Sequence, residues 1–317
     1  MKHSTTYKAV FFILLIITAD WFVGFILAHL YKRSEDITIS KIRYTLYETE
    51  EDVLIFGSSR AQHHYIPDIL VEGTNSTSFN CGLGGQPLAF SLVQISETLR
   101  RYKPQTIILD VTPDFRFDLD SDPRLKTLGP YYKTDTLVKE ILLDNGSKLE
   151  KLKFLSSIYP YNGMLADIVL AYIYVPDVSI KGYIPSPPGT IDPNWLPEED
   201  SADNQEIPRK QEMYLNRIAE ICNKDDINLW IIISPLYRTT VEEQKISSQI
   251  KVFAENNNIH LIDFSLHDEF SDYQLFKDHL HLTTSGAEKF TIMVRDSLFS
   301  GKDFLLDIGP DELASGN

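Results

Sequence analysis

The chain has 317 residues and a formal net charge of −15, and 43% of its residues are hydrophobic. This length suits one large domain, or one domain that carries an insertion. A surface this acidic repels phosphate backbones, so we expect no nucleic-acid partner. The two cysteines, Cys81 and Cys222, fit neither a metal-binding spacing nor a disulfide framework. We interpret them as small buried apolar residues.

The amino-terminal segment has the length and composition of a membrane-spanning helix. Residues Ala9–Leu30 form an apolar run in which Asp20 is the only formally charged residue, and about 20 such residues cross the hydrocarbon core. Tyr7 and Tyr31 flank the run, as interfacial aromatics do. We therefore predict an uncleaved membrane anchor over residues 1–33. A cleavable signal peptide and a buried core helix are the alternatives, but ILAHLYKR is a poor cleavage site.

The basic residues on the two sides of this segment are nearly balanced. Lys2 and Lys8 precede it, and Lys32 and Arg33 follow it. We expect a single span with an inside amino terminus, which places the large domain outside the cytoplasm. For Asp20, pairing with another segment or simple tolerance fits a single span better than catalysis.

Beyond residue 51, apolar strand-like runs alternate with helical patterns. Val53–Phe56 is continuously apolar, as expected for a strand covered on both faces. This alternation predicts a parallel, doubly wound sheet with five strands, in a three-layer α/β/α, flavodoxin-like arrangement. The expected strands are Val53–Phe56, Ser76–Asn80, Thr106–Val111, Leu229–Ser234 and Ile259–Phe264. The expected helices cover about 59–70, 88–102, 207–223, 241–256 and 285–299, and residues 34–51 read as a linker or a first helix.

Residues at about 116–205 interrupt this alternation. Their first part has a helical pattern, whereas the second part is rich in Pro, Asp and Glu and predicts an irregular loop. A segment of this kind forms either a lid or substrate surface, or a solvated loop over the sheet edge. We therefore predict an anchor, residues 1–33, and one domain, residues 34–317, with an insertion at about 116–205.

Polar clusters follow the strands at the edge where open parallel sheets bind ligands. A serine nucleophile needs a base and an oriented imidazole, and His281 with Asp278 three residues earlier supplies that pair. A serine at a helix start offers its own N–H to an oxyanion, and glycines let another amide approach closely. The clusters are Gly57–Arg60, Asn80–Gln86, Thr112–Asp114 and Asp278–His281.

These clusters resemble the sequence blocks of the SGNH, or GDSL-like, hydrolase superfamily. GSSR at 57–60 matches the first block, NCGLGGQ at 80–86 the second, and DHLH at 278–281 the last. The resemblance covers roughly residues 50–115 and 225–300. It implies Ser59 as the nucleophile, His281 as the base, Asp278 as its orienting acid and Gly85 as the oxyanion-hole glycine.

The third block departs from the family pattern. Members usually carry G-x-N-D after the third strand, where the asparagine completes the oxyanion hole. Here the stretch is Val111-Thr112-Pro113-Asp114, and Pro113 has neither an N–H nor an amide side chain. The third donor is therefore missing or is supplied from elsewhere, which implies slower hydrolysis, a specialised acyl transfer or lost activity.

Simpler structural roles stand beside these assignments. Ser58 and Ser59 are both common helix caps, and His281 also fits a core histidine. We count Gly85, Arg60 and Asn80 as candidate oxyanion or substrate-binding residues. Asn80, like Gln86, also suits the closing of a turn.

Arg60 is expected to hold an anionic substrate or to pair with a carboxylate such as Asp110 or Asp114. Of His63 and His64, we expect one to pack and the other to face solvent. No metal-ligand spacing is present, and we expect no metal and no cofactor.

The resemblance favours a membrane-anchored esterase or O-acyltransferase that acts on acyl esters of a cell-surface polysaccharide. A lipid esterase or thioesterase near the bilayer is a second enzymatic reading. The alternative is a catalytically impaired glycan-binding or scaffold subunit of a surface-polymer assembly. The acyl group, the acceptor and the oligomeric state are left open by the sequence.

Overall fold

Five short apolar runs form one parallel sheet in the order β2-β1-β3-β4-β5, which is the flavodoxin-like order. This parallel five-stranded sheet confirms the predicted α/β fold class. The computed structural model describes residues 2–113, 123–173, 179–189, 191–197 and 206–299. The strands are β1 (Val53–Phe56), β2 (Ser78–Asn80), β3 (Thr106–Asp110), β4 (Asn228–Ile233) and β5 (His260–Asp263).

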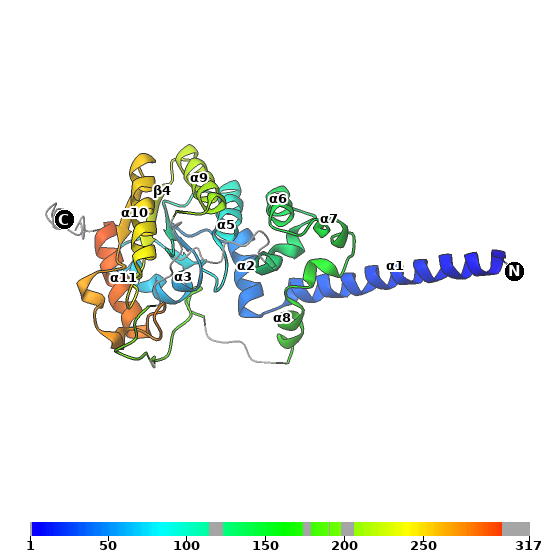
Figure 1. Cartoon of the computed structure of the whole chain (residues 1–317), viewed down its shortest axis with the longest axis horizontal. Coiled ribbons are helices and arrows are strands. Elements are labelled where there is room, and N and C mark those ends of the chain that lie inside the picture. Colours follow the sequence, from blue (N-terminus) through cyan, green and yellow to red (C-terminus); the bar gives the residue numbers. More distant parts are fainter. Residues whose placement is uncertain (1, 114–122, 174–178, 190, 198–205, 300–317) are drawn as a thin grey trace.

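Helices cover both faces of the sheet and give the three layers (Figure 1). One face packs against α2 (Ile37–Tyr47), α5 (Leu88–Arg101), α9 (Arg209–Lys224) and α10 (Val241–Asn256). The other packs against α3 (Ser59–His64), α4 (Pro67–Leu70) and α11 (Thr284–Phe299). In α9, buried Leu215, Ile218 and Cys222 recur at helical spacing and so form one core-facing stripe. Cys81 and Cys222 are both free and buried, as predicted.

The helix expected at about 59–70 is interrupted. It forms α3 and α4, and Tyr65 and Ile66 between them have extended backbones. Pro67 explains the break, because its ring disfavours the helical conformation of the residue before it. The break turns the chain, and it lets Tyr65 send its hydroxyl to Asp110 at the end of β3.

The described part of the predicted insertion has two characters, as expected. Residues 123–173 are mostly helical, and residues 179–189 and 191–197 hold an isolated bridge between Ile180 and Tyr183 and otherwise turns and irregular chain. The elements of the first part are η1 (Pro123–Tyr131), α6 (Thr136–Asp144), α7 (Glu150–Lys153), η2 (Tyr159–Tyr161) and α8 (Leu165–Leu170). Two further short 3-10 helices, η3 (Asp268–Phe270) and η4 (Tyr273–Leu275), follow β5.

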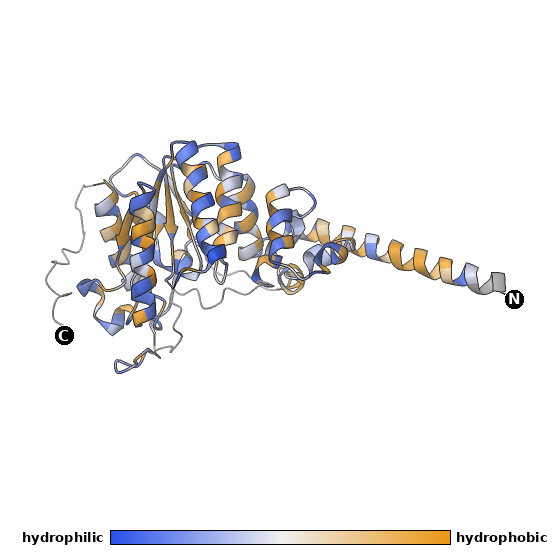
Figure 2. Cartoon of the chain, turned by 45° about the horizontal axis from the view of Figure 1, so that its top comes forward, coloured by the Kyte–Doolittle hydropathy of each residue, from blue (hydrophilic) through white to orange (hydrophobic). Residues whose placement is uncertain are grey.

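One long helix, α1 (Lys2–Arg33), projects from the body (Figure 1). Its stretch Thr6–Arg33 is long and apolar enough to cross a membrane, and only 11% of its most apolar window is buried. Figure 2 shows hydrophobic residues along the projecting part. The end nearest the sheet is different, because Leu27 and Tyr31 belong to the main hydrophobic core.

Candidate active site

Ser59, His281 and Asp278 form one hydrogen-bonded chain at the carboxyl edge of the sheet. His281 Nε2 lies 2.7 Å from Ser59 Oγ, and His281 Nδ1 lies 2.9 and 3.0 Å from the two Asp278 carboxylate oxygens. Since Asp278 accepts from Nδ1–H, Nε2 is left as the acceptor for the serine proton. This is the arrangement a serine nucleophile requires.

The Asp278 carboxylate is held in place by its own turn. Oδ1 accepts hydrogen bonds from the backbone N–H groups of Leu280 and His281, both at 3.0 Å. Partial burial works to raise the pKa of this carboxyl, but the His281 ring and the two amides outweigh it and lower the pKa to about 2. Asp278 therefore stays ionised at neutral pH and can stabilise an imidazolium.

Ser59 is the first residue of α3, directly after the Gly57–Ser58 turn that ends β1. Ser58 occupies the helix-cap position but makes no side-chain capping bond. Gly57 has a φ of +145°, and a Cβ there would lie 2.8 Å from the Asp110 carbonyl oxygen. Only glycine fits this turn, and the turn is what places Ser59 beside His281.

Gly85 carries the free amide of the glycine loop. Three neighbouring amides are occupied: Gly82 N–H donates to Asn80 Oδ1 (3.0 Å), Leu83 N–H to the Gly57 carbonyl (3.0 Å), and Gly84 N–H to Gln62 Oε1 (2.7 Å). Within the described residues Gly85 N–H has no acceptor. This pattern suits the assignment of Gly85 as an oxyanion donor, since such a donor must be unpaired before the reaction.

Asn80 is not a substrate-binding residue, so that candidate assignment was wrong. Its side chain is fully buried; its amide nitrogen donates to the carbonyls of Ala61 (2.7 Å) and Tyr65 (2.9 Å), and its oxygen accepts from Gly82. The hydrogen-bonding capacity of the amide goes to the end of α3 and to the second loop. Asn80 therefore fastens the loop with Gly85 to the helix with Ser59.

Arg60 is buried, and among the described residues no ion pair joins it to a carboxylate. Only 1% of the residue is exposed; its Nε donates to Ser234 Oγ (2.9 Å) and Nη2 to the Ser234 carbonyl. Burial raises the pKa of Asp110, and the positive charge of Arg60 opposes that shift. Asp114, the other predicted partner, lies outside the described residues. Nη1 of Arg60 has no partner in the part of the chain that the structure describes, and Arg60 lines the cavity beside Ser59.

His64 holds the histidine loop against α3. It is fully buried, its Nδ1 lies 3.1 Å from Ser234 Oγ, and its Nε2 accepts the Leu282 N–H at 3.0 Å. Because Leu282 follows His281 directly, this bond fixes the backbone beside His281. His64 is thus the histidine expected to pack. His63 is partly buried instead of solvent-facing, because its Nδ1 donates to the Ile184 carbonyl at 2.8 Å.

The second part of the insertion, within the described residues 179–189 and 191–197, packs beside the site. Ile184 N–H donates to the Gln62 carbonyl at 3.2 Å, and Trp195 stacks on His279 with ring centroids 4.7 Å apart. A Cβ on Gly189 would lie 2.2 Å from atoms of the Lys277 backbone. These contacts with α3 and with the loop of Asp278 and His281 support the substrate-surface reading over a solvated loop.

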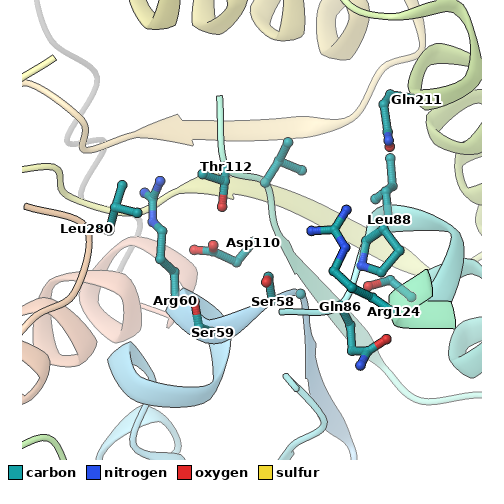
Figure 3. Close-up of a pocket in the computed structure, with 14 residues that line it drawn as sticks. Ser58, Ser59, Arg60, Gln86, Leu88, Asp110, Thr112, Arg124, Gln211 and Leu280 are labelled. Carbon is teal, nitrogen blue, oxygen red and sulfur yellow. The ribbon is translucent and has the colours of Figure 1, made fainter. Parts of the chain in front are cut away.

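At the end of β3, the cavity is lined by Thr112 rather than by Pro113. Figure 3 shows the Thr112 hydroxyl pointing into the space between Arg60 and Asp110. The cavity has a volume of about 210 Å³. Its polar lining residues include Ser58, Arg60, Gln86, Thr112, Arg124 and Gln211. Among the described residues, no group of three or more His, Cys, Asp or Glu could hold a metal ion.

Sequence reasoning missed two supporting residues, Gln62, which holds Gly84, and Ser234, which binds His64. It also did not predict that His64 binds the loop of His281. The only available signal was the position of Gln62 and His64 on the helix after Ser59. Nothing near Ser234 in the sequence points to Arg60 or His64, which lie 174 and 170 residues away.

Comparisons with solved structures return distantly similar lipases and esterases. A GDSL-like lipase from Bacteroides thetaiotaomicron is 12% identical, covers 78% of this chain and 88% of its own, and gives a TM-score of 0.39. The psychrotrophic esterase EstA from Pseudoalteromonas sp. is 11% identical over 78% of this chain and 94% of its own, also with a TM-score of 0.39. No family model and no curated protein matches the sequence. At these similarities, function has to be inferred from the site itself.

Replacing Gly85 by alanine tests its role as an oxyanion donor. Gly85 has a φ of +72° with no atom within 4 Å of an added Cβ, so alanine strains the backbone by about 1–2 kcal/mol and turns the amide. We expect ester hydrolysis to fall roughly 100-fold. Gly73→Ala is a matched control, because Gly73 has a φ of +80° and equally open surroundings. Equal activity losses in the two variants would show that the effect is only strain.

Acid should destabilise the fold through His64. Burial, then the charges of Arg60, His281 and His63, lower the pKa of His64 well below its usual 6.5. Below pH 6.5 the unfolded chain binds a proton at His64, whereas the folded chain keeps this ring neutral. The stability that depends on neutral His64 is therefore present above pH 6.5 and is lost as the pH falls. Below that pH the free energy of unfolding should drop by up to about 1.4 kcal/mol per pH unit.

Chemical unfolding of the full chain in detergent, measured from about pH 7.5 to about pH 5.5, checks this slope. In His64→Gln, which keeps a donor and an acceptor without titrating, the slope should be shallower by that amount. An identical slope in the two proteins would contradict the assignment.

Proposed function

We propose that the protein is a serine esterase or O-acyltransferase that acts on acyl esters and is held at the membrane by α1. The observation that carries the proposal is the unbroken hydrogen-bonded chain from Asp278 through His281 to Ser59. A buried serine cap or a core histidine would not explain why all three side chains meet in this order.

The reaction has two halves. Ser59 Oγ attacks the ester carbonyl while His281 Nε2 takes the hydroxyl proton; the tetrahedral intermediate collapses, the alkoxide leaves with that proton, and an acyl-serine remains. Water or a sugar hydroxyl then attacks the acyl carbon, gives its proton to His281 and releases Ser59. Asp278 orients the ring and balances its charge in each half.

The oxyanion requires donors on the side of the carbonyl away from His281. The N–H of Ser59, at the first position of α3, and the unpaired N–H of Gly85 are two of them. We assign the third to the Thr112 hydroxyl, which lines the cavity one residue before Pro113, the position where the resemblance implies an asparagine. Within the described residues that hydroxyl makes no hydrogen bond, so it is available to a bound substrate.

The cavity favours a small acyl group on a polar carrier. A volume of about 210 Å³ lies below the usual range for drug-sized ligands, which suits a short acyl group better than a long fatty chain. Arg60, Arg124 and Gln211 on its walls suit hydroxyl or anionic groups. A short-chain ester of a cell-surface polysaccharide is therefore the proposed substrate, and a lipid ester is the less suitable one.

The packing of α1 supports an uncleaved anchor over a signal peptide. Leu27 and Tyr31 are core residues, and the Tyr31 hydroxyl donates to Tyr131 at 2.8 Å. Cleavage before residue 34 would remove these side chains from the core, at a cost of about 2–5 kcal/mol for each large one. We place the catalytic domain outside the cytoplasm, where surface polysaccharide is modified.

The second candidate is a non-catalytic glycan-binding subunit, and the observation in its favour is the absence of an amide side chain after β3. A fluorophosphonate probe separates the two, because it forms a bond only with an activated serine. We expect labelling of the full chain, loss of labelling in Ser59→Ala and His281→Ala, and retention in Ser58→Ala, the matched neighbour. A folded, unlabelled wild type would favour the binding subunit.

The Thr112 assignment has its own test in a pair of variants. Thr112→Val keeps the shape and removes the hydroxyl, so kcat with a short-chain ester should fall about 10- to 100-fold with little change in KM. Thr112→Ser keeps the donor and should lose far less. If valine and serine behave alike, the hydroxyl is not an oxyanion donor.

A further inference from the structure

The free part of α1 is too short to cross a bilayer by itself. The helix's apolar stretch begins at Ala9, directly after Lys8, and the first hydrogen bond between its described residues and the insertion lies at Asp20. At 1.5 Å per residue these twelve positions span only about 18 Å, whereas the hydrocarbon core is about 30 Å thick. A helix that starts at Lys8 leaves the hydrocarbon near Ala28, roughly 20 residues on. The contact at Asp20 therefore lies below the surface of the bilayer.

The insertion makes that contact. Asp20 accepts hydrogen bonds from the Ser156 hydroxyl and, at 2.6 Å, from the Ser157 N–H. A Cβ on Gly24 would lie 2.5 Å from Ser157, so the glycine permits the close approach. Nearer the sheet, the Tyr172 hydroxyl donates to the Leu30 carbonyl at 3.0 Å. The insertion thus holds α1 from Asp20 to Leu30, and it satisfies the charge that would otherwise stand alone in lipid.

The segments that make these contacts expose large apolar side chains. These side chains lie on or next to α7 and α8, close to the serines and the tyrosine that bind α1. Between 51% and 77% of each of these residues is exposed. We name this set the collar: Leu149, Leu152, Leu155, Val169, Leu170 and Ile173. Figure 1 shows α7 and α8 at the end of the body from which α1 projects.

Lysines accompany the leucines around α7. Lys148 and Lys151 are exposed, and neither has a carboxylate partner among the described residues. They are a local excess of positive charge in a chain whose net charge is −15. Leucines that enter the acyl region beside lysines that reach the phosphates are the signature of a segment lying in a membrane interface.

We propose that the collar is immersed in the outer boundary of the same bilayer that α1 crosses, so that lipid, and not a protein, covers these side chains. The proposal rests on the membrane anchor of the proposed function and is independent of the catalytic assignment. Three features favour lipid. The collar is continuous with the apolar surface of α1, the contact at Asp20 lies below the bilayer surface, and the two lysines Lys148 and Lys151 lie beside the leucines. The collar would fix the height of the active site above the membrane.

Fluorescence quenching in reconstituted full-length protein tests this directly. An environment-sensitive dye is attached to Leu155→Cys or Ile173→Cys in bilayers of mixed neutral and anionic lipids that carry nitroxides on their acyl chains. Phe12→Cys on α1 reports the anchor, and Val252→Cys, 54% exposed on α10, is the matched aqueous control. Cys81 and Cys222 are buried and should not react with the dye.

We expect the nitroxide lipids to reduce emission by about half at positions 155, 173 and 12, and to leave position 252 unchanged. Quenching at 12 without quenching at 155 and 173 would overturn the collar and leave the anchor standing. Blue-shifted but unquenched dyes at 155 and 173 would mean that protein covers them, which also overturns the proposal. No quenching at 12 would defeat the anchor itself.

Discussion

The site depends on the bond that joins α3 to the loop after β5. Ser59 and His281 lie 222 residues apart, so their 2.7 Å approach must be fixed by the surroundings of each. His64, on the helix that begins with Ser59, accepts the N–H of Leu282, the residue after His281. One neutral, buried ring therefore holds Ser59 and His281 at this distance. His64 can accept this hydrogen bond only while its ring is neutral. Burial is the main cause of the low pKa that keeps the ring neutral.

A second group of buried polar residues assembles the rest of the site around the same helix. Ser234 after β4 binds both Arg60 and His64. Asn80, the last residue of β2, binds the carbonyls of Ala61 and Tyr65 and also the glycine loop. Four loops that are remote in sequence thereby meet at one short helix. A buried polar network of this kind offsets the free-energy cost of desolvating its members only when each member has a hydrogen-bond partner. Within the described residues, Nη1 of Arg60 is the member of this network that lacks a partner, and Arg60 lines the cavity.

The sequence predicted those features that depend on neighbouring residues. Continuous apolar runs identified the strands, and the three-residue separation of Asp278 and His281 predicted that these two side chains pair. It could not assign a role to Asn80, because the carbonyls that Asn80 binds are brought to it by the turn before Pro67. Nor could it distinguish Thr112 from Pro113, because the side chain that reaches the cavity depends on how the chain leaves β3. The partner of Asp20 lies 136 residues away, and only the fold brings Ser156 to it.

The most direct test of the account is the structure of the full chain after reaction with a small phosphonate ester. We predict a phosphonyl group bonded to Ser59 Oγ, with one phosphoryl oxygen within about 3 Å of the N–H groups of Ser59 and Gly85 and of the Thr112 hydroxyl. His281 should keep its bond to Asp278. An adduct on Ser58, or a phosphoryl oxygen directed away from Gly85, would contradict the assignment of nucleophile and oxyanion hole.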